Sequence, residues 1–216
     1  MKKTFSVVVV LFMLLMLPAV SFSAAPRPYI SGQLGVAFLA DSDITETGYS
    51  TETLTLEFDP GFATSFAGGV NFGMFRVEGE IGYQINDIDR VTGGGYSYNA
   101  NADAYCLSFL VNGYIDFVNT SRFTPYISAG IGIANVGVES DDDYYCDGYS
   151  CYDSDYYDDD DTVFAYQVGA GVAYAINKNM TLDLKYRFFA TEDPNLYGSK
   201  AEFKSHNIYF GFRFTF

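Results

Sequence analysis

The sequence predicts an all-β protein, an eight-stranded antiparallel up-and-down transmembrane β-barrel with short periplasmic turns and long extracellular loops. Three observations predict it: an N-terminal export signal, apolar residues that alternate with polar ones over eight segments, and connections that alternate between short and long. Transmembrane barrels of the bacterial outer membrane combine an alternating strand pattern with this asymmetry of connections.

The N-terminus has the order of a secretory signal peptide. Lys2 and Lys3 precede an apolar run over residues 7–17, which Pro18 and the small residues of 21–25 follow. The run has 11 residues, whereas a membrane-spanning helix needs about 20, so an N-terminal anchor is the disfavoured alternative. We assign 1–23 to a signal peptide and 24–216 to one barrel domain, with a cut one residue later as the alternative.

Composition excludes one class of partner and favours β-structure. Removing Lys2 and Lys3 changes the formal net charge from −15 to −17, and no basic patch remains. Such a chain is not expected to bind nucleic acid. The sequence holds 21 Gly, 20 Phe and 19 Tyr but no Trp, and aromatic residues spread in short apolar stretches are typical of strands.

The final strand shows the alternation most clearly. Over 206–216, one face carries an Ile and four Phe, while the other carries Asn, Tyr, Gly, Arg and Thr. A lipid-facing surface favours the apolar face, and the barrel interior accommodates the polar one. A sandwich strand buried on one face is the alternative for this segment taken alone.

Seven further segments repeat the pattern with period two. In chain order they are 29–40, 62–75, 76–86, 102–117, 126–138, 163–176 and 181–191. Each is long enough to cross a membrane while tilted, for which about 9–11 residues suffice.

The connections between these segments alternate in length. Short ones lie at 73–75, 118–124 and 177–179, and long polar ones at 41–61, 87–101, 139–162 and 192–202. An even strand count with this alternation puts both termini at the periplasmic end. The predicted location is the outer membrane of a Gram-negative bacterium.

Four pieces of the sequence carry a resemblance to a known family. They are 28–32 (PYISG), 125–132 (PYISAGIG), 166–172 (YQVGAGV) with Tyr186-Arg187, and the terminal aromatic strand. The chain resembles the small outer-membrane β-barrel superfamily of OmpA-like, opacity-type and bacterial surface-antigen proteins. The resemblance implies that Phe216 is the signal read by the barrel assembly machinery, and that the protein serves adhesion or acts as a surface antigen.

Strand parity places eight charged residues inside the barrel. They are Arg76, Glu78, Glu80, Asp116, Asp183, Lys185, Arg187 and Arg213. An eight-stranded barrel is only wide enough for its side chains to fill it. We therefore favour a packed core of paired charges over the alternative, a narrow ion path through the same residues.

The third long connection is the most acidic part of the chain. Residues 139–161 hold ten Asp, one Glu and six Tyr, and no Lys or Arg occurs between Arg122 and Lys178. Carboxylates at this density can bind Ca²⁺ weakly, although no segment has the twelve-residue calcium-loop pattern. A solvated acidic loop is favoured over a specific site, and no other cofactor is expected. The candidate ligands are Asp141, Asp142, Asp143, Asp153, Asp155, Asp158, Asp159, Asp160 and Asp161.

The cysteines and the single histidine complete the candidate chemistry. Cys146 and Cys151 lie close together in an exported chain, so we predict that they form a disulfide. Cys106 falls on an inward face. His206 has no Ser or Asp partner in the sequence pattern, which disfavours an outer-membrane lipase, acyltransferase or protease.

The sequence therefore predicts a non-enzymatic surface protein whose acidic, Tyr-rich loop contacts other surfaces. The expected partners are outer-membrane lipid, lipopolysaccharide bridged by divalent cations, the barrel assembly machinery, and a ligand on a host or other cell. The alternative function is a narrow pore for ions or small solutes.

Overall fold

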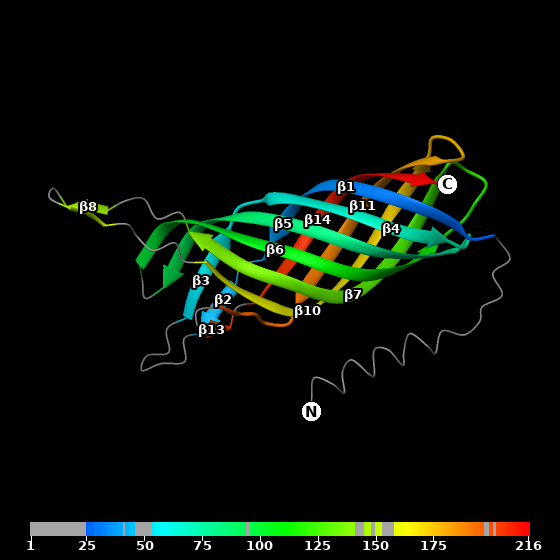
Figure 1. Ribbon diagram of the computed structural model, residues 1–216. Coiled ribbons are helices and arrows are strands. Elements are labelled where there is room, and N and C mark those ends of the chain that lie inside the picture. Colours follow the sequence, from blue (N-terminus) through cyan, green and yellow to red (C-terminus); the bar gives the residue numbers. More distant parts are fainter. Residues whose placement is uncertain are drawn as a thin grey trace, which may run out of the picture.

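The computed structural model describes residues 25–40, 42–45, 53–93, 96–140, 145–147, 150–152, 158–196, 199–200 and 202–216. Eight long antiparallel strands form a closed barrel (Figure 1), as predicted. They are β1 (Arg27–Leu39), β4 (Gly61–Asn71), β5 (Phe75–Gly93), β6 (Tyr96–Asp116), β7 (Phe123–Ser140), β10 (Asp158–Ala175), β11 (Met180–Thr191) and β14 (Lys204–Thr215). None of the described residues forms a helix long and apolar enough to cross a membrane.

The barrel closes by pairing its first and last strands. β1 runs antiparallel to β14 from the pair Tyr29 and Thr215 to the pair Leu39 and Ser205. Each other barrel strand pairs with the barrel strands next to it in the sequence. Because closure leaves no open sheet edge, every strand can cross lipid with its backbone groups paired.

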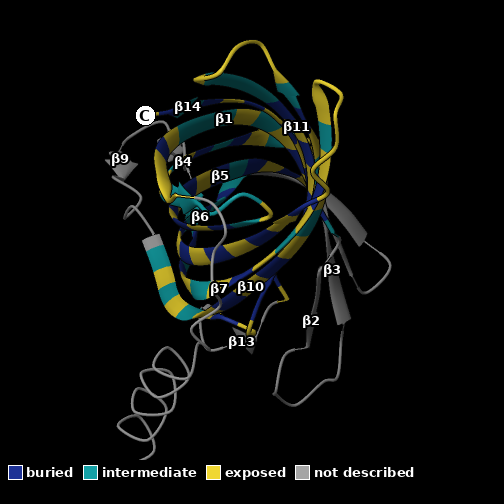
Figure 2. Ribbon diagram, turned by 90° about the vertical axis from the view of Figure 1, so that its right-hand side faces the viewer, coloured by how far each residue is buried: buried dark blue, intermediate teal, exposed yellow. Residues whose placement is uncertain are grey.

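Exposed and buried residues alternate along the barrel strands, and Figure 2 shows this as yellow and dark blue bands, with teal where burial is intermediate. Large apolar side chains point outward: Leu34 is 60% exposed, Phe66 is 66% exposed and Phe210 is 60% exposed. An apolar surface this extensive is unfavourable in water but is the surface that a lipid bilayer accommodates.

Short turns connect strands at the end where β14 finishes. Gly73 joins β4 to β5 with a φ of 92°, a conformation that favours glycine. In the turn between β6 and β7, the amide of Ser121 donates to Asn119 Oδ1 at 2.7 Å. Between β10 and β11, the amide of Met180 donates to Asn177 Oδ1 at 2.9 Å. In the first turn the amide of Gly73 donates to Asn71 Oδ1 at 2.7 Å, so Asn side chains hold all three turns.

At the opposite end the structure corrects the predicted strand lengths. The expected loop at 87–101 is largely strand, because β5 and β6 continue beyond the apolar belt, and the expected loop at 139–162 is shortened because β7 continues to Ser140 and β10 begins at Asp158. The alternation persists there with polar outward residues: Asp87 and Asp89 are exposed, and Ile88 between them is buried. The predicted strand at 62–75 was too long, since β4 ends at Asn71 and the Gly73 turn follows.

Additional short strands lie at this outer end. β3 (Thr53–Phe58) pairs with β2 (Ser42–Thr45) and with the extension of β5. β8 (Tyr145–Asp147) pairs with β9 (Ser150–Tyr152), and β12 (Asn195–Leu196) pairs with β13 (Ser199–Lys200). The predicted signal peptide, 1–23, lies outside the described residues.

Candidate functional site

The structure places all eight predicted interior charges inside the barrel. Each is buried, with exposures of 1–6%. Arg76, Glu78 and Glu80 come from β5, Asp116 from β6, Asp183, Lys185 and Arg187 from β11, and Arg213 from β14. Four carry a positive and four a negative formal charge, so the set is neutral as a whole.

One cluster lies toward the short-turn end of the interior. Arg76 makes two parallel hydrogen bonds to Asp116, from Nε at 2.8 Å and from Nη2 at 2.9 Å. Its guanidinium carbon also lies 4.1 Å from the centroid of the Tyr114 ring. A bidentate ion pair stacked on an aromatic ring fixes both the charge and the orientation of the arginine.

Glu78 is held by hydroxyl groups. The hydroxyl of Tyr29 donates to its Oε2 at 2.6 Å, and the hydroxyl of Tyr114 donates to its Oε1. Nearby, Arg213 Nη2 lies 3.2 Å from Asp183 Oδ1. This part of the interior therefore contains a carboxylate supported by tyrosines beside two arginine–carboxylate pairs.

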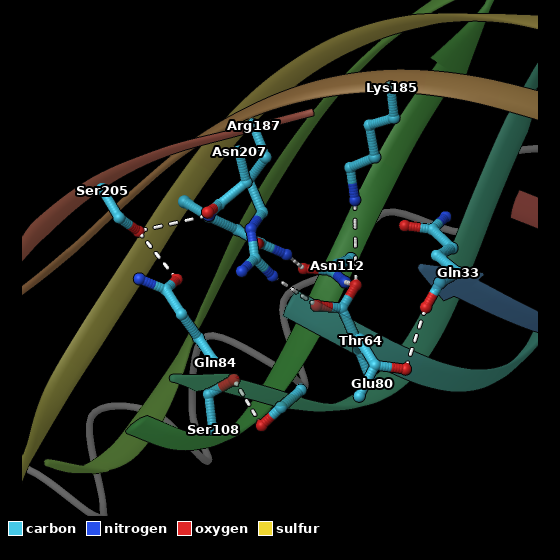
Figure 3. A network of polar contacts seen from close by, with 12 residues as sticks. Gln33, Thr64, Glu80, Gln84, Ser108, Asn112, Lys185, Arg187, Ser205 and Asn207 are labelled. Carbon is cyan, nitrogen blue, oxygen red and sulfur yellow. Dashed lines mark hydrogen bonds and ion pairs between the residues drawn. The ribbon is translucent and has the colours of Figure 1, made fainter. Parts of the chain in front are cut away.

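Glu80 is the centre of the next layer, which Figure 3 shows from close by. Its Oε1 lies 3.1 Å from Arg187 Nη1, and its Oε2 lies 3.7 Å from Lys185 Nζ. Asn112 Nδ2 donates to Oε2 at 2.9 Å, and Gln167 Nε2 donates in turn to Asn112 Oδ1 at 2.6 Å. Residues from β5, β6, β10 and β11 thus meet at one carboxylate and link opposite walls of the barrel.

Neutral polar residues form a third layer toward the outer end. Ser205 Oγ donates to Gln84 Oε1 at 3.0 Å, and Gln84 Nε2 donates to Asn86 Oδ1 at 2.9 Å. Asn86 Nδ2 donates to the carbonyl oxygens of Ala37 and Asp59, each at 3.0 Å. These bonds connect three strands and bind the start of β4 to the wall.

Apolar side chains are buried at the level of this layer and beyond it, with Cys106 opposite Gln84 and Phe189 opposite Ser205 in the strand pairing. Buried side chains pack there as one cluster: Leu39, Ile88, Ala104, Cys106, Leu110, Ala134, Val136, Ala165, Phe189 and Phe203. The rings of Phe189 and Phe203 meet edge to face, with centroids 6.1 Å apart. We call these ten residues the apolar plug. A packed apolar layer excludes water and ions from the segment of the interior that it fills.

The sequence analysis missed the apolar plug, although its parity signal was present. Phe189 has the same parity as Arg187, and Val136 and Ala134 share the inward parity of β7. Tyr29 and Tyr114, which support Glu78, were missed in the same way. Attention to charged residues alone hid the apolar and aromatic parts of the same inward face.

The predicted calcium ligands are only partly described. Asp141, Asp142, Asp143, Asp153 and Asp155 lie outside the described residues. Asp158, Asp159, Asp160 and Asp161 belong to β10, where successive side chains point to opposite faces of the sheet. Asp160 Oδ2 accepts from Asn135 Nδ2 at 2.5 Å, and Asp161 Oδ2 accepts from the amide of Asn195 at 3.0 Å. The described residues contain no group of three or more potential metal ligands.

The remaining predicted residues have defined places. The backbone register of β8 and β9 sets Cys146 opposite Cys151, whose side chains lie outside the described part. Cys106 is buried within the apolar plug with a free thiol. Phe216 follows β14 and is 63% exposed. His206 is on the outer face, and its Nδ1 lies 2.7 Å from the hydroxyl of Tyr186.

Comparisons with known proteins agree with this architecture. The sequence profile of the outer membrane protein beta-barrel domain matches residues 7–216. Outer membrane protein PagN of Salmonella typhimurium is 27% identical over 121 residues, which cover 50% of this chain and 49% of PagN. An uncharacterized protein of Brucella abortus is 32% identical over 101 residues, which cover 47% of this chain and 36% of that protein. The matches therefore span half or less of these curated relatives.

A solved structure shares the fold at low sequence identity. The crystal structure of Neisserial surface protein A superposes with a TM-score of 0.59 at 19% identity, covering 89% of this chain and 99% of that one. A family profile that matches nearly the whole chain and a closed eight-stranded barrel lead to the same assignment. The chain belongs to the outer membrane protein beta-barrel domain family and is a protein of the Gram-negative outer membrane.

Proposed function

We propose that this protein is a non-enzymatic, non-conducting barrel whose acidic extracellular end makes contacts with cations, lipopolysaccharide and other cell surfaces. The observation that carries the proposal is the segregation of charge. Of 27 acidic residues, 23 belong to the connections and strand extensions at the outer end, against three of the 12 basic residues. The other four acidic residues are the buried carboxylates of the interior, whose formal charge four buried basic residues balance.

This distribution favours contacts through cations. A dense carboxylate surface attracts divalent ions and cationic groups, and divalent ions can bridge it to the phosphates of lipopolysaccharide. The six Tyr of 139–161 add amphipathic side chains to the same region, and Tyr is common in binding loops. The strand extensions of β7 and β10 carry this segment beyond the apolar belt.

The interior supports a sealed barrel over the alternative, a narrow pore. Its eight formal charges sum to zero. Seven of them lie in three ion-paired groups, Glu78 is held by tyrosine hydroxyls, and the apolar plug is buried toward the outer end. An ion would have to break buried pairs and enter an apolar layer, both of which are costly.

The surroundings of His206 on the outer face do not suit a general base. Its described hydrogen bond is to the hydroxyl of Tyr186, and the rings of Tyr186 and Phe188 flank it on the outer face. A nucleophile–histidine–carboxylate arrangement needs a different set of neighbours. The proposal therefore assigns no catalysis to this barrel.

The test uses a deletion whose limits follow the strands. Residues 141–157 are replaced by Asn-Gly, which keeps β7 and β10 intact. We expect refolded protein to lose Ca²⁺ binding in equilibrium dialysis, and bacteria displaying it to lose adhesion to cultured epithelial cells. Permeability of those bacteria to small solutes should stay unchanged.

Two full-length variants separate charge from loop length. In the first, Asp141, Asp142, Asp143, Asp153 and Asp155 are changed to Asn. In the second, the matched control, the five acidic residues Asp41, Asp43, Glu46, Glu52 and Glu57 are changed to their amides. We expect the first variant to reproduce the deletion and the second to retain most of both properties. If the deletion alters neither adhesion nor Ca²⁺ binding, the proposed function is wrong.

A further inference from the structure

We infer that the periplasmic rim of the barrel carries a binding site for one anionic phospholipid of the inner leaflet. The inference concerns the end opposite the acidic surface and is independent of the proposed function. It starts from three exposed cations there, Arg27, Arg122 and Lys178, which come from the start of β1 and from two different turns.

Hydrogen bonds to backbone carbonyl oxygens bring these three cations to one turn. Arg27 Nη2 donates to the carbonyl oxygen of Lys178 at 2.9 Å, so the first strand reaches the turn between β10 and β11. The amide of Ala175, just before that turn, donates to the carbonyl oxygen of Arg122 at 2.9 Å. In Figure 1 the turn lies beside the end of β14, as expected from the 2.8 Å hydrogen bond between Thr215 and Asn179.

Among the described residues, no Asp or Glu side chain forms an ion pair with the rim cations. The acidic residues closest to this end are Asp116 and Asp183, and both are buried and paired with interior arginines. Across the described part of the chain, no Asp or Glu side chain is exposed at this rim. The described contacts of Arg122 involve its backbone, which leaves its guanidinium open to a phosphate ester.

An apolar groove on the lipid-facing surface begins where Arg122 stands. Ser121 and Arg122 line one end, and the groove continues along the outer faces of β10, β11 and β14. Its apolar lining is Phe123, Val172, Tyr174, Leu182, Leu184 and Phe210, and the lining also includes Asp183, which is buried and paired with Arg213. The ring centroids of Phe123 and Tyr174 lie 4.9 Å apart, and these two rings form the wall of the groove nearest the cations.

The apolar groove and the three rim cations together favour one class of ligand. The groove faces hydrocarbon and can take an acyl chain, while the cations stand at the depth of the headgroup and favour negative charge. A neutral or zwitterionic lipid satisfies only the groove, and a soluble phosphate compound satisfies only the cations. An anionic glycerophospholipid satisfies both.

The experiment measures lipid binding to the refolded mature chain in detergent micelles by native mass spectrometry. The probes are dioleoyl phosphatidylglycerol and dioleoyl phosphatidylcholine. We expect one phosphatidylglycerol to bind preferentially, and Arg122→Gln to lower its affinity about fivefold, since each basic residue near a membrane surface contributes on this scale. The combined variant Arg27→Gln/Arg122→Gln/Lys178→Gln should abolish the preference.

The control variants distinguish binding at this site from nonspecific electrostatic attraction of anionic lipid to the protein. Lys204→Gln removes a solvent-accessible cation at the opposite end of the barrel and should leave the preference unchanged. Val172→Trp fills the groove from an outward position and should weaken phosphatidylglycerol binding without changing the rim charges. sn-Glycerol 3-phosphate, which lacks acyl chains, should neither bind nor compete.

Three results would overturn the inference. The first is equal binding of the two phospholipids to the unsubstituted protein, and the second is a preference for phosphatidylglycerol that survives in the triple variant. The third is an equal loss of phosphatidylglycerol affinity from Arg122→Gln and from Lys204→Gln. Heat-modifiable migration on a gel establishes that each variant is folded before binding is measured.

Discussion

At the scale of single residues, the interior is organised by complementary charge. The single carboxylate of Glu80 contacts three residues, Arg187, Lys185 and Asn112. Strand parity predicted that such residues face inward, because alternation is a local property of the backbone. Parity could not predict which partners meet, since that depends on the register of strands far apart in the sequence.

Removing the charge of Glu80 tests whether these pairs stabilise the barrel. Glu80→Gln keeps the side-chain shape but leaves the buried cations Lys185 and Arg187 without their carboxylate. We expect the free energy of unfolding to fall by about 3–5 kcal/mol, measured by guanidinium titration in phospholipid micelles. The control is Glu202→Gln, which removes the partner of the exposed Lys204 and should change little. Equal stability of the two variants would contradict the account.

A second residue-scale prediction concerns close approach between β6 and β7. A Cβ atom at Gly132 would lie 2.0 Å from the carbonyl oxygen of Phe109, whereas one at Gly113 would meet no atom within 4 Å. We expect Gly132→Ala to destabilise the barrel by about 1–3 kcal/mol, because a backbone atom cannot rotate away. Gly113→Ala should cause no loss in the same titration. A stable Gly132→Ala variant would show that the strands can separate there.

At the scale of elements, the sequence predicted the existence and direction of all eight barrel strands but not their outer ends. Outward-facing apolar residues stop at the membrane boundary, yet the backbone pairing continues. Asp158–Asp161 illustrate this, since four consecutive acidic residues have no strand preference but pair with 136–139 of β7. Pairing propagated from the membrane-embedded part overrides local propensity.

The register of β8 and β9 leads to a prediction about redox state. Cys146 and Cys151 are directly opposite each other, and opposed residues of antiparallel strands have Cα atoms about 4.5–5.5 Å apart, within the range for a disulfide. Protein purified from the outer membrane and denatured without reductant should take up one alkyl group, at Cys106. After reduction it should take up three. Mass spectrometry distinguishes these states, and three alkyl groups without reductant would exclude the disulfide.

At the scale of the whole molecule, charge is sorted into three zones. The outer end is strongly acidic, the interior is neutral as a set, and the described periplasmic rim is basic. The first zone was predictable from composition and connection lengths. The neutral interior required the structure to show its pairing, and the apolar plug emerged from inward residues that carry no charge. The grouping of the rim cations could not be predicted, because β1 and the two turns that carry them come together only when the barrel closes.

The measurement that tests this account most directly is single-channel conductance of the refolded mature barrel in a planar lipid bilayer. Folding is established first by heat-modifiable migration on a gel. The account predicts a silent bilayer, because paired charges and the apolar plug seal the interior and leave function to the outer end. Discrete conductance steps that shift when Arg76, Glu78 or Arg187 is neutralised would contradict it and would make the interior the functional site.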